Sequence, residues 1–219
     1  MVRAMCGIVG YVGNQKCAPI LLDGLRRLEY RGYDSAGIAV HSAKSVDIVR
    51  TVGKLKNLEN ALREKEPQGT VGIGHTRWAT HGAPSEVNAH PHLVGSVAVV
   101  HNGIIENHVV VRNKLKEAGH KIVRDTDTEP IPHIISIEVD KGADLLAAGR
   151  TTLAIVEGAY AIAVISLKQP DRIVVAKNGS PLVVGIGEGE MFAGSDIPAL
   201  LPYTREMIFL EDGEVAELT

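Results

Sequence analysis

Hydrophobic residues follow two kinds of spacing along this 219-residue chain. Short apolar runs bounded by turn residues are typical of strands, and apolar residues three or four positions apart are typical of helices. The runs predict strands at residues 8–12, 38–40, 46–51, 71–75, 97–100, 121–124, 159–165, 173–176, 182–185, 191–194, 207–210 and 215–218. The helical spacing predicts helices at 17–30, 55–62, 104–119 and 144–156, another that starts within 125–129, and a helical turn at 197–201.

The order of these elements predicts an α+β fold. Strands follow one another as in a meander, and the helices come in two or three groups rather than after every strand. Two packed antiparallel sheets with helices on both outer faces would use every predicted element.

The stretch from residue 76 to residue 92 has neither helical nor alternating periodicity, and it contains the chain's one tryptophan, Trp78. Long segments without secondary structure are usually functional or disordered. The flanking strands and the expected burial of Trp78 favour an ordered loop. We therefore expect a lid, with Gly82 as its hinge. Asn102-Gly103, after the next strand, is typical of a turn, and it can also aim an amide and a backbone N–H at one point.

Composition and charge exclude several classes of function. The net charge of −3 gives no electrostatic case for nucleic acid or for an acidic membrane as partner. Apolar runs stay short of the roughly 20 residues of a transmembrane helix, and no secretory leader is recognisable. The two cysteines make no disulfide framework, so we expect a reducing, cytoplasmic setting.

Cys6 is the candidate nucleophile. If the working chain began at Cys6, one residue would supply a thiol and an α-amino group, whose pKa of about 7.7–8.0 suits a base better than the value of about 10.4 for Lys. Residues 1–5 stand ahead of it, and initiation at Met5 followed by removal of that methionine would expose Cys6. We expect residues 1–5 to be a leader or extension, and residues 6–219 to form the domain.

Other chemistry was weighed against this interpretation. Six of the nine histidines fall between residues 75 and 108, but neither a helical metal motif nor a cysteine cluster accompanies them, so no metal and no cofactor is expected. A Cys–His pair stays open, because the spacing selects no single histidine. Cys17 is expected to pack as an inert helix residue. Arg31, in a tight loop, is either a surface turn residue or a neighbour of the nucleophile.

Six motifs stand in an order that resembles class II glutamine amidotransferases of the N-terminal-nucleophile family, and within them the glutaminase domain of glucosamine-6-phosphate synthases. They are Cys6–Gly10, Leu28–Gly37, Gly74–Gly82, Asn88–His92, His101–Asn107 and Thr126–Glu129. The resemblance covers residues 6–219. It implies a four-layer αββα sandwich, the N-terminal-nucleophile hydrolase fold.

The same resemblance implies hydrolysis of L-glutamine to glutamate and ammonia through a thioester on Cys6. The Asn102 side chain and the Gly103 N–H would hold the oxyanion. Arg77 would bind the α-carboxylate of glutamine, and Asp127 its α-ammonium group. The other binding residues implied in this way are Trp78, Thr80, His81 and Arg31.

The resemblance also implies partners. The ammonia would convert fructose 6-phosphate to glucosamine 6-phosphate in the complete enzyme, for hexosamine synthesis. The chain ends at Thr219, so the sugar-isomerase domains are expected to be absent from it; a homo-oligomer is compatible with the sequence. Two alternatives remain: an N-terminal-nucleophile hydrolase of another amide, and a non-catalytic scaffold or regulatory domain with a blocked Cys6.

Overall fold

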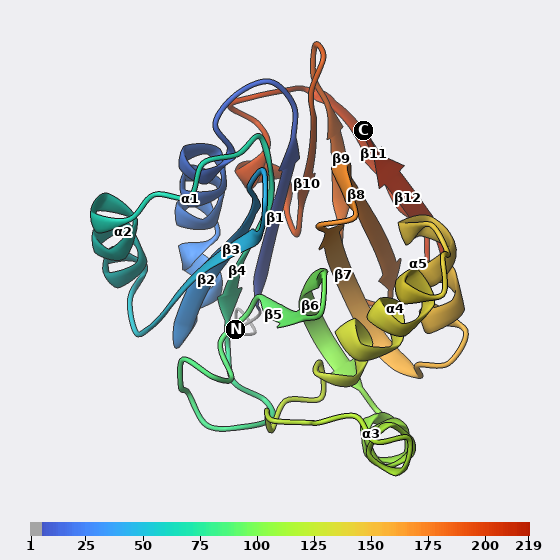
Figure 1. Cartoon of the computed structure of the whole chain (residues 1–219). Coiled ribbons are helices and arrows are strands. Elements are labelled where there is room, and N and C mark those ends of the chain that lie inside the picture. Colours follow the sequence, from blue (N-terminus) through green and yellow to red (C-terminus); the bar gives the residue numbers. More distant parts are fainter. Residues whose placement is uncertain (1–5) are drawn as a thin grey trace.

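Two antiparallel sheets lie face to face at the centre of the computed structural model, which describes residues 6–219 (Figure 1). The expected extension, residues 1–5, lies outside the described residues. The larger sheet has the strand order β11-β9-β10-β1-β4-β2-β3. Its strands are β1 (Gly7–Val12), β2 (Ser35–His41), β3 (Val46–Val52), β4 (Val71–Arg77), β9 (Val183–Ile186), β10 (Met191–Gly194) and β11 (Glu206–Phe209).

The smaller sheet has the strand order β12-β8-β7-β6-β5. Its strands are β5 (His92–Val94), β6 (Val97–Ile105), β7 (Gly158–Ser166), β8 (Gln169–Asn178) and β12 (Val215–Leu218). The apolar runs of β6, β7 and β8 are buried on both faces, which explains why they read as continuous hydrophobic stretches.

Helices cover both outer faces, as Figure 1 shows, so the expected four-layer arrangement is confirmed. α1 (Cys17–Arg27) and α2 (Leu55–Glu64) pack on the larger sheet, and α4 (Pro130–Asp140) and α5 (Leu145–Leu153) pack on the smaller one. α3 (His108–Glu117) packs against α4 through Val111, Leu115 and Ile134. Two short 3-10 helices complete the chain, η1 (Glu29–Arg31) and η2 (Ile197–Ala199).

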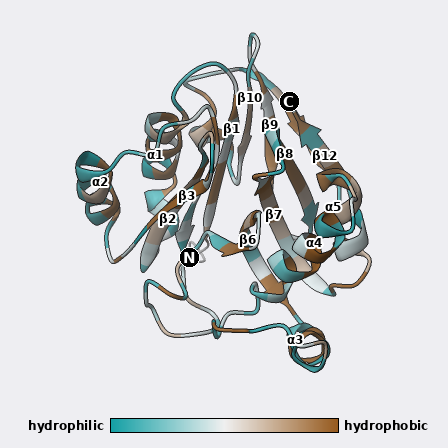
Figure 2. Cartoon of the chain, viewed as in Figure 1, coloured by the Kyte–Doolittle hydropathy of each residue, from teal (hydrophilic) through white to brown (hydrophobic). Residues whose placement is uncertain are grey.

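Aliphatic side chains fill the space between the layers. The cluster between the sheets includes Ile8, Ile73, Val100 and Ile173, all of them buried. Figure 2 shows the same division, with hydrophobic colour along the strands and hydrophilic colour on the outer sides of α1 and α2. Within residues 6–219, no helix has both the length and the apolar character needed to cross a membrane.

Several local predictions are wrong. The strand expected at 97–100 continues through Asn102 and Gly103 to Ile105, so that pair is not a turn, and α3 begins only at residue 108. Residues 121–124 form no strand. α4 starts at Pro130 without a side-chain cap, because the carboxylate of its N-cap residue, Glu129, accepts from the Val123 and Arg124 N–H groups instead. The Asp127 carboxylate accepts from the distant Ile105 N–H.

Gly37 lets the loop before β5 approach the larger sheet. A Cβ atom built on this residue would lie 2.4 Å from the His90 carbonyl oxygen and 2.8 Å from that of Val49. Both obstacles are backbone atoms, so relief would require the loop or the strand to move. The loop that carries cleft residues is therefore seated directly on β2.

We expect Gly37→Ala to lower the free energy of unfolding by about 1–3 kcal/mol, the usual cost of overpacking. Gly10→Ala is the matched strand control, because its nearest new contact is a side-chain atom, Ala193 Cβ, at 3.3 Å. Urea denaturation of both variants measures the difference. Equal stability of the two variants would contradict a close backbone approach at Gly37.

Candidate active site

The pairing of β1 with β4 brings Cys6 beside the start of the long loop. Gly7 pairs with Thr76, so the residues after β4 lie next to Cys6. The Trp78 backbone N–H donates to the Cys6 sulfur at 3.1 Å, and the thiol lies 3.5 Å from the Trp78 carbonyl oxygen. On the other side of β4, the Asp34 N–H donates to the Arg77 carbonyl at 2.7 Å. Three strand ends thus meet at one point.

Asn102 on β6 connects the second sheet to this point. Its Nδ2 lies 3.1 Å from the Cys6 carbonyl oxygen, which can only accept, so the orientation of the amide is fixed. Nδ2 also donates to the Ser195 hydroxyl at 2.8 Å. The amide oxygen lies 2.9 Å from His75 Nε2, and that nitrogen must therefore carry the hydrogen. Both amide hydrogens consequently have protein acceptors in this state.

Gly103, the next residue, has a φ of +117°. A Cβ atom there would lie 2.0 Å from the Ala159 carbonyl oxygen. Only glycine fits this backbone position, which explains why the Asn-Gly pair can stand inside a strand. With this φ, the peptide groups around Gly103 are oriented differently from those of a regular strand.

A narrow cleft lies between these elements. It brings together all the sequence-predicted site residues except Asn102 and Arg31. Its lining is Cys6, Arg77, Trp78, Thr80, His81, His90, His101, Gly103, Thr126, Asp127 and Thr128. Its interior volume of about 10 Å³ has room for one water molecule. The cleft is too narrow in this conformation for an amino acid, so side chains of its lining must move before one can enter.

Arg77 and Asp127 face this cleft, each with one side already engaged. Arg77 Nη2 donates to the carbonyls of His81 and Gly82 at 2.5 and 2.8 Å. Its Nη1 is buried and has no hydrogen-bond partner among residues 6–219. Asp127 Oδ2 accepts from the Ile105 N–H at 2.9 Å, and its Oδ1 lies 3.9 Å from His81 Nδ1.

Trp78 differs from expectation, whereas the burial of Arg31 excludes one of the two alternatives left open for it. The Trp78 side chain is 46% exposed, so its expected burial is wrong; the contact with Cys6 is made by its backbone. Arg31 is buried rather than on a surface turn. Its guanidinium donates to the Ser195 carbonyl at 3.3 Å and lies 3.6 Å from Asp196 Oδ2. Arg31 thus lies behind the cleft rather than in its lining.

Burial raises the pKa of the Cys6 thiol above its ordinary value. The Trp78 N–H and the positive charges of Arg77 and Arg31 act to lower that pKa, but they do not offset the burial. The thiol is therefore protonated at neutral pH and needs a base. Among residues 6–219, the hydrogen-bond partners of this sulfur are backbone groups of Trp78, not an imidazole.

Four buried histidines form a cluster beside the cleft that sequence reasoning left without a role. The rings of His75 and His90 are 4.3 Å apart, and those of His90 and His92 are 4.4 Å apart and stacked. Thr128 Oγ1 lies within 3.0 Å of ring nitrogens of His90 and His101, and Thr126 Oγ1 lies 2.8 Å from His92. In the described part of the chain, no group of three or more His, Cys, Asp or Glu residues is arranged to hold a metal ion.

Two further residues escaped the sequence analysis. Ser195 accepts from the Ile8 N–H at 2.7 Å as well as from Asn102, and Asp34 accepts from the Ala79 N–H at 2.5 Å. A single serine 187 residues away from Ile8 has no local signal. His90 and His92 were noted only as part of a histidine-rich stretch, and their partners Thr128 and Thr126 lie more than 30 residues away.

Comparisons with known proteins agree with this geometry. The family described as "Glutamine amidotransferase domain" matches residues 75–202. A glutamine–fructose-6-phosphate aminotransferase (isomerizing) of Thermus thermophilus is 54% identical over 98% of this chain, and that of Shewanella oneidensis is 55% identical over 98%. The chain spans only 35% and 36% of their lengths.

Solved structures give the same architecture. The glutamine phosphoribosylpyrophosphate amidotransferase of B. subtilis has a TM-score of 0.84 and 25% identity, over 97% of this chain and 47% of its own. A glutamine aminotransferase class-II domain protein from Silicibacter pomeroyi, at 16% identity and a TM-score of 0.64, shares the fold.

We expect the free energy of unfolding to fall steeply below about pH 6.5. In the unfolded chain histidine binds a proton near pH 6.5, whereas burial lowers the pKa of His75 to about 3 and also lowers the pKa values of His90, His92 and His101. Below the unfolded value the unfolded state holds more protons, so each histidine removes up to about 1.4 kcal/mol per pH unit. Urea denaturation between pH 7.5 and 5 measures the slope.

His92→Gln isolates one imidazole, since a glutamine can still meet Thr126. This variant should lower the slope of the unfolding free energy against pH by the contribution of one titrating group. An unchanged slope in this variant, or a wild-type stability that is constant down to pH 5, would contradict burial of uncharged imidazoles.

Proposed function

Because this chain belongs to the glutamine amidotransferase domain family, we propose that it hydrolyses the side-chain amide of L-glutamine with Cys6 as the nucleophile. The observation that carries this proposal is the common lining of one cleft by Cys6, Arg77 and Asp127. A thiol, a guanidinium and a carboxylate are the groups that complement an amide with an α-carboxylate and an α-ammonium at its other end.

The binding roles follow from the donor and acceptor atoms of each side chain that other residues do not already engage. The buried Nη1 of Arg77 is a donor in need of an acceptor, and the α-carboxylate of glutamine would satisfy it. Asp127 is fixed through Oδ2, which leaves Oδ1 for the α-ammonium group. Trp78, Thr80 and His81 would close over the substrate, and Arg31 would act from behind through its charge on the sulfur.

The reaction would proceed in two halves. The Cys6 sulfur attacks the amide carbon, the thiol proton passes through the α-amino group of Cys6 to the leaving nitrogen, and ammonia departs from a thioester. Water then attacks the thioester carbon, and the same amine takes a proton from this water and passes it to the departing Cys6 sulfur. The C–S bond breaks, glutamate is released and the thiol is restored. Asn102 and the Gly103 N–H would hold the oxyanion in both halves; removal of one such donor typically costs about 10²–10³ in rate.

This oxyanion role requires a change from the resting state. Both hydrogens of the Asn102 amide have acceptors, at the Cys6 carbonyl and the Ser195 hydroxyl. One hydrogen must exchange its acceptor for the oxyanion as substrate enters. This exchange would take place when the loop after Arg77 opens, because that loop contacts Cys6 through the Trp78 N–H. The contacts around Cys6 would then form again with substrate present.

We further propose that the ammonia serves the conversion of fructose 6-phosphate to glucosamine 6-phosphate, in hexosamine synthesis. The support is the activity for which these relatives are named and their greater length, which leaves room for sugar-isomerase domains as partners. Both cysteines are unbridged, and the proposed nucleophile must stay reduced, which favours a cytoplasmic setting.

We expect a chain that begins at Cys6 to release glutamate and ammonia from glutamine, and Cys6→Ala to lose at least about 10³-fold of this activity with its fold intact. Cys17→Ala is the matched control, because that thiol is buried in α1 and burial raises its pKa to about 12. Coupled ammonia detection and circular dichroism measure the two effects. Full activity in Cys6→Ala, or hydrolysis of other amides in preference to glutamine, would sink the proposal.

Residues 1–5 provide a second test, since their retention turns the amine of Cys6 into a peptide nitrogen. A chain that keeps them should be at least about 10²-fold slower than one that begins at Cys6, the usual contribution of a general base. Intact-mass measurement of each assayed sample establishes which N terminus is present. Equal rates for the two forms would show that another group takes the thiol proton.

A further inference from the structure

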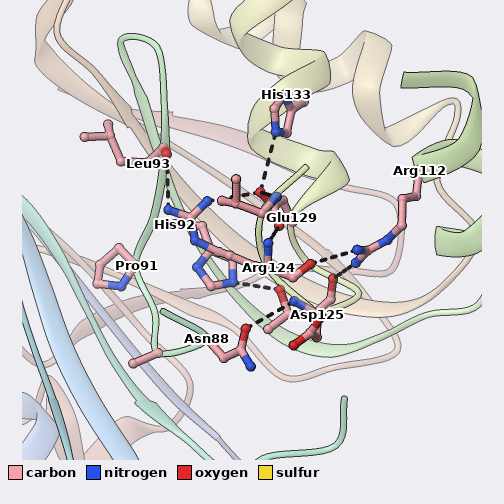
Figure 3. A network of polar contacts seen from close by, with 12 residues as sticks. Asn88, Pro91, His92, Leu93, Arg112, Arg124, Asp125, Glu129 and His133 are labelled. Carbon is pink, nitrogen blue, oxygen red and sulfur yellow. Dashed lines mark hydrogen bonds and ion pairs between the residues drawn. The ribbon is translucent and has the colours of Figure 1, made fainter. Parts of the chain in front are cut away.

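The segment that carries Asp127 to the cleft has no regular structure of its own. Residues 121–125 form neither helix nor strand, and residues 126–129 form a turn before α4. Such a segment keeps a fixed shape only if other groups satisfy its backbone N–H and carbonyl groups. Figure 3 shows that side chains from three directions do this.

The N–H groups of the segment are held by two acceptors. The buried Glu129 carboxylate accepts from the Val123 N–H at 3.0 Å and also from the Arg124 N–H, and it lies 3.2 Å from Arg124 Nη1. Asn88 Oδ1 accepts from the Asp125 N–H at 3.1 Å. These contacts fix the half of the segment that precedes Thr126.

In Figure 3, the side chain that donates to carbonyl groups of this segment is that of Arg112. Its Nη1 donates to the Arg124 carbonyl at 2.7 Å, and its Nη2 donates to the Thr126 carbonyl at 2.6 Å. The Thr126 carbonyl belongs to the same planar peptide unit as the Asp127 N–H. Arg112 therefore sets the orientation of the peptide that leads directly into Asp127.

Arg112 is itself held firmly although it is not part of the cleft lining. It lies on α3 next to Val111, and that helix packs on Ile134 of α4. Its planar fork spans two carbonyls at once, which a lysine ammonium cannot reproduce. Arg112 thus connects a packed helix, α3, to the peptide that leads into Asp127.

We propose that Arg112 is a positioning residue that sets Asp127 for the α-ammonium group and thereby gives the site its selectivity for amides of α-amino acids. This inference rests on the proposed function, because it assigns the partner of Asp127 Oδ1. The selectivity can be measured as the ratio of kcat/KM for L-glutamine to that for glutaramate, which is glutamine without its α-amino group.

We expect Arg112→Met to lower this ratio roughly 10- to 100-fold, the effect of a misplaced binding group. The loss should lie in KM for glutamine, while kcat/KM for glutaramate changes by less than about threefold, because glutaramate makes no contact with Asp127 to lose. Arg112→Lys should lower the ratio as well, since it keeps the charge but not the fork. Lys116→Met, at an exposed position of the same helix, removes the same charge and should leave the ratio unchanged.

The possible outcomes separate the two proposals. A ratio that stays at the wild-type value in both Arg112 variants overturns the positioning role. A parallel fall in activity on both substrates, with a lower melting temperature, assigns Arg112 a structural role only and also overturns it. A chain that begins at Cys6, is otherwise unchanged and hydrolyses neither amide would overturn the proposed function and this inference with it.

Discussion

A buried side-chain amide, that of Asn102, joins the two sheets at their cleft end. It reaches from β6 to the Cys6 carbonyl and the Ser195 hydroxyl of the other sheet, and it is itself held by His75. The apolar contact between the sheets is extensive but has no preferred direction. A buried amide that lost these partners would leave polar groups unsatisfied at a cost of about 1–3 kcal/mol each. The Asn102 contacts therefore favour one relative position of the sheets at this end.

Asn102 has a structural role and a proposed catalytic role at the same time. Asn102 fixes the peptide that follows the sulfur, and Asp34 ties the Ala79 N–H to the start of β2. A change that weakens either contact would loosen the cleft, and at Asn102 it would also affect a proposed oxyanion donor. Deletion of one of these side chains thus reports on position as well as on chemistry, and effects on stability and activity must be separated by measuring both.

The strands and helices were largely predictable, because alternation and helical spacing record local burial. The failures lie where distant partners override a local signal. Asn102-Gly103 has the composition of a turn, yet a positive φ at Gly103 and a close approach to Ala159 keep it inside β6. Asp127 has the composition of a helix cap, yet its carboxylate bonds to Ile105.

The site was predictable only as far as motifs reach. Cys6 could be named from its own chemistry, Arg77 and Asp127 through a resemblance, and all three line one cleft. His75, Ser195 and Arg112 could not be named, because what matters about them is a contact made by folding across 27, 93 and 14 residues. A lone serine or arginine has no pattern that reveals which carbonyl or amide it will meet.

The burial that organises the cleft also restricts which group can serve as base. It raises the pKa of the Cys6 thiol, so the attack needs a group that takes the thiol proton. It also lowers the pKa of His75 to about 3, which makes that imidazole too weak a base, and His75 Nε2 already donates to Asn102. His90 and His101 are likewise tied to Thr128 and have lowered pKa values. The proposed function therefore uses the α-amino group of a chain that begins at Cys6, whose ordinary pKa of about 7.7–8.0 lies close to neutrality.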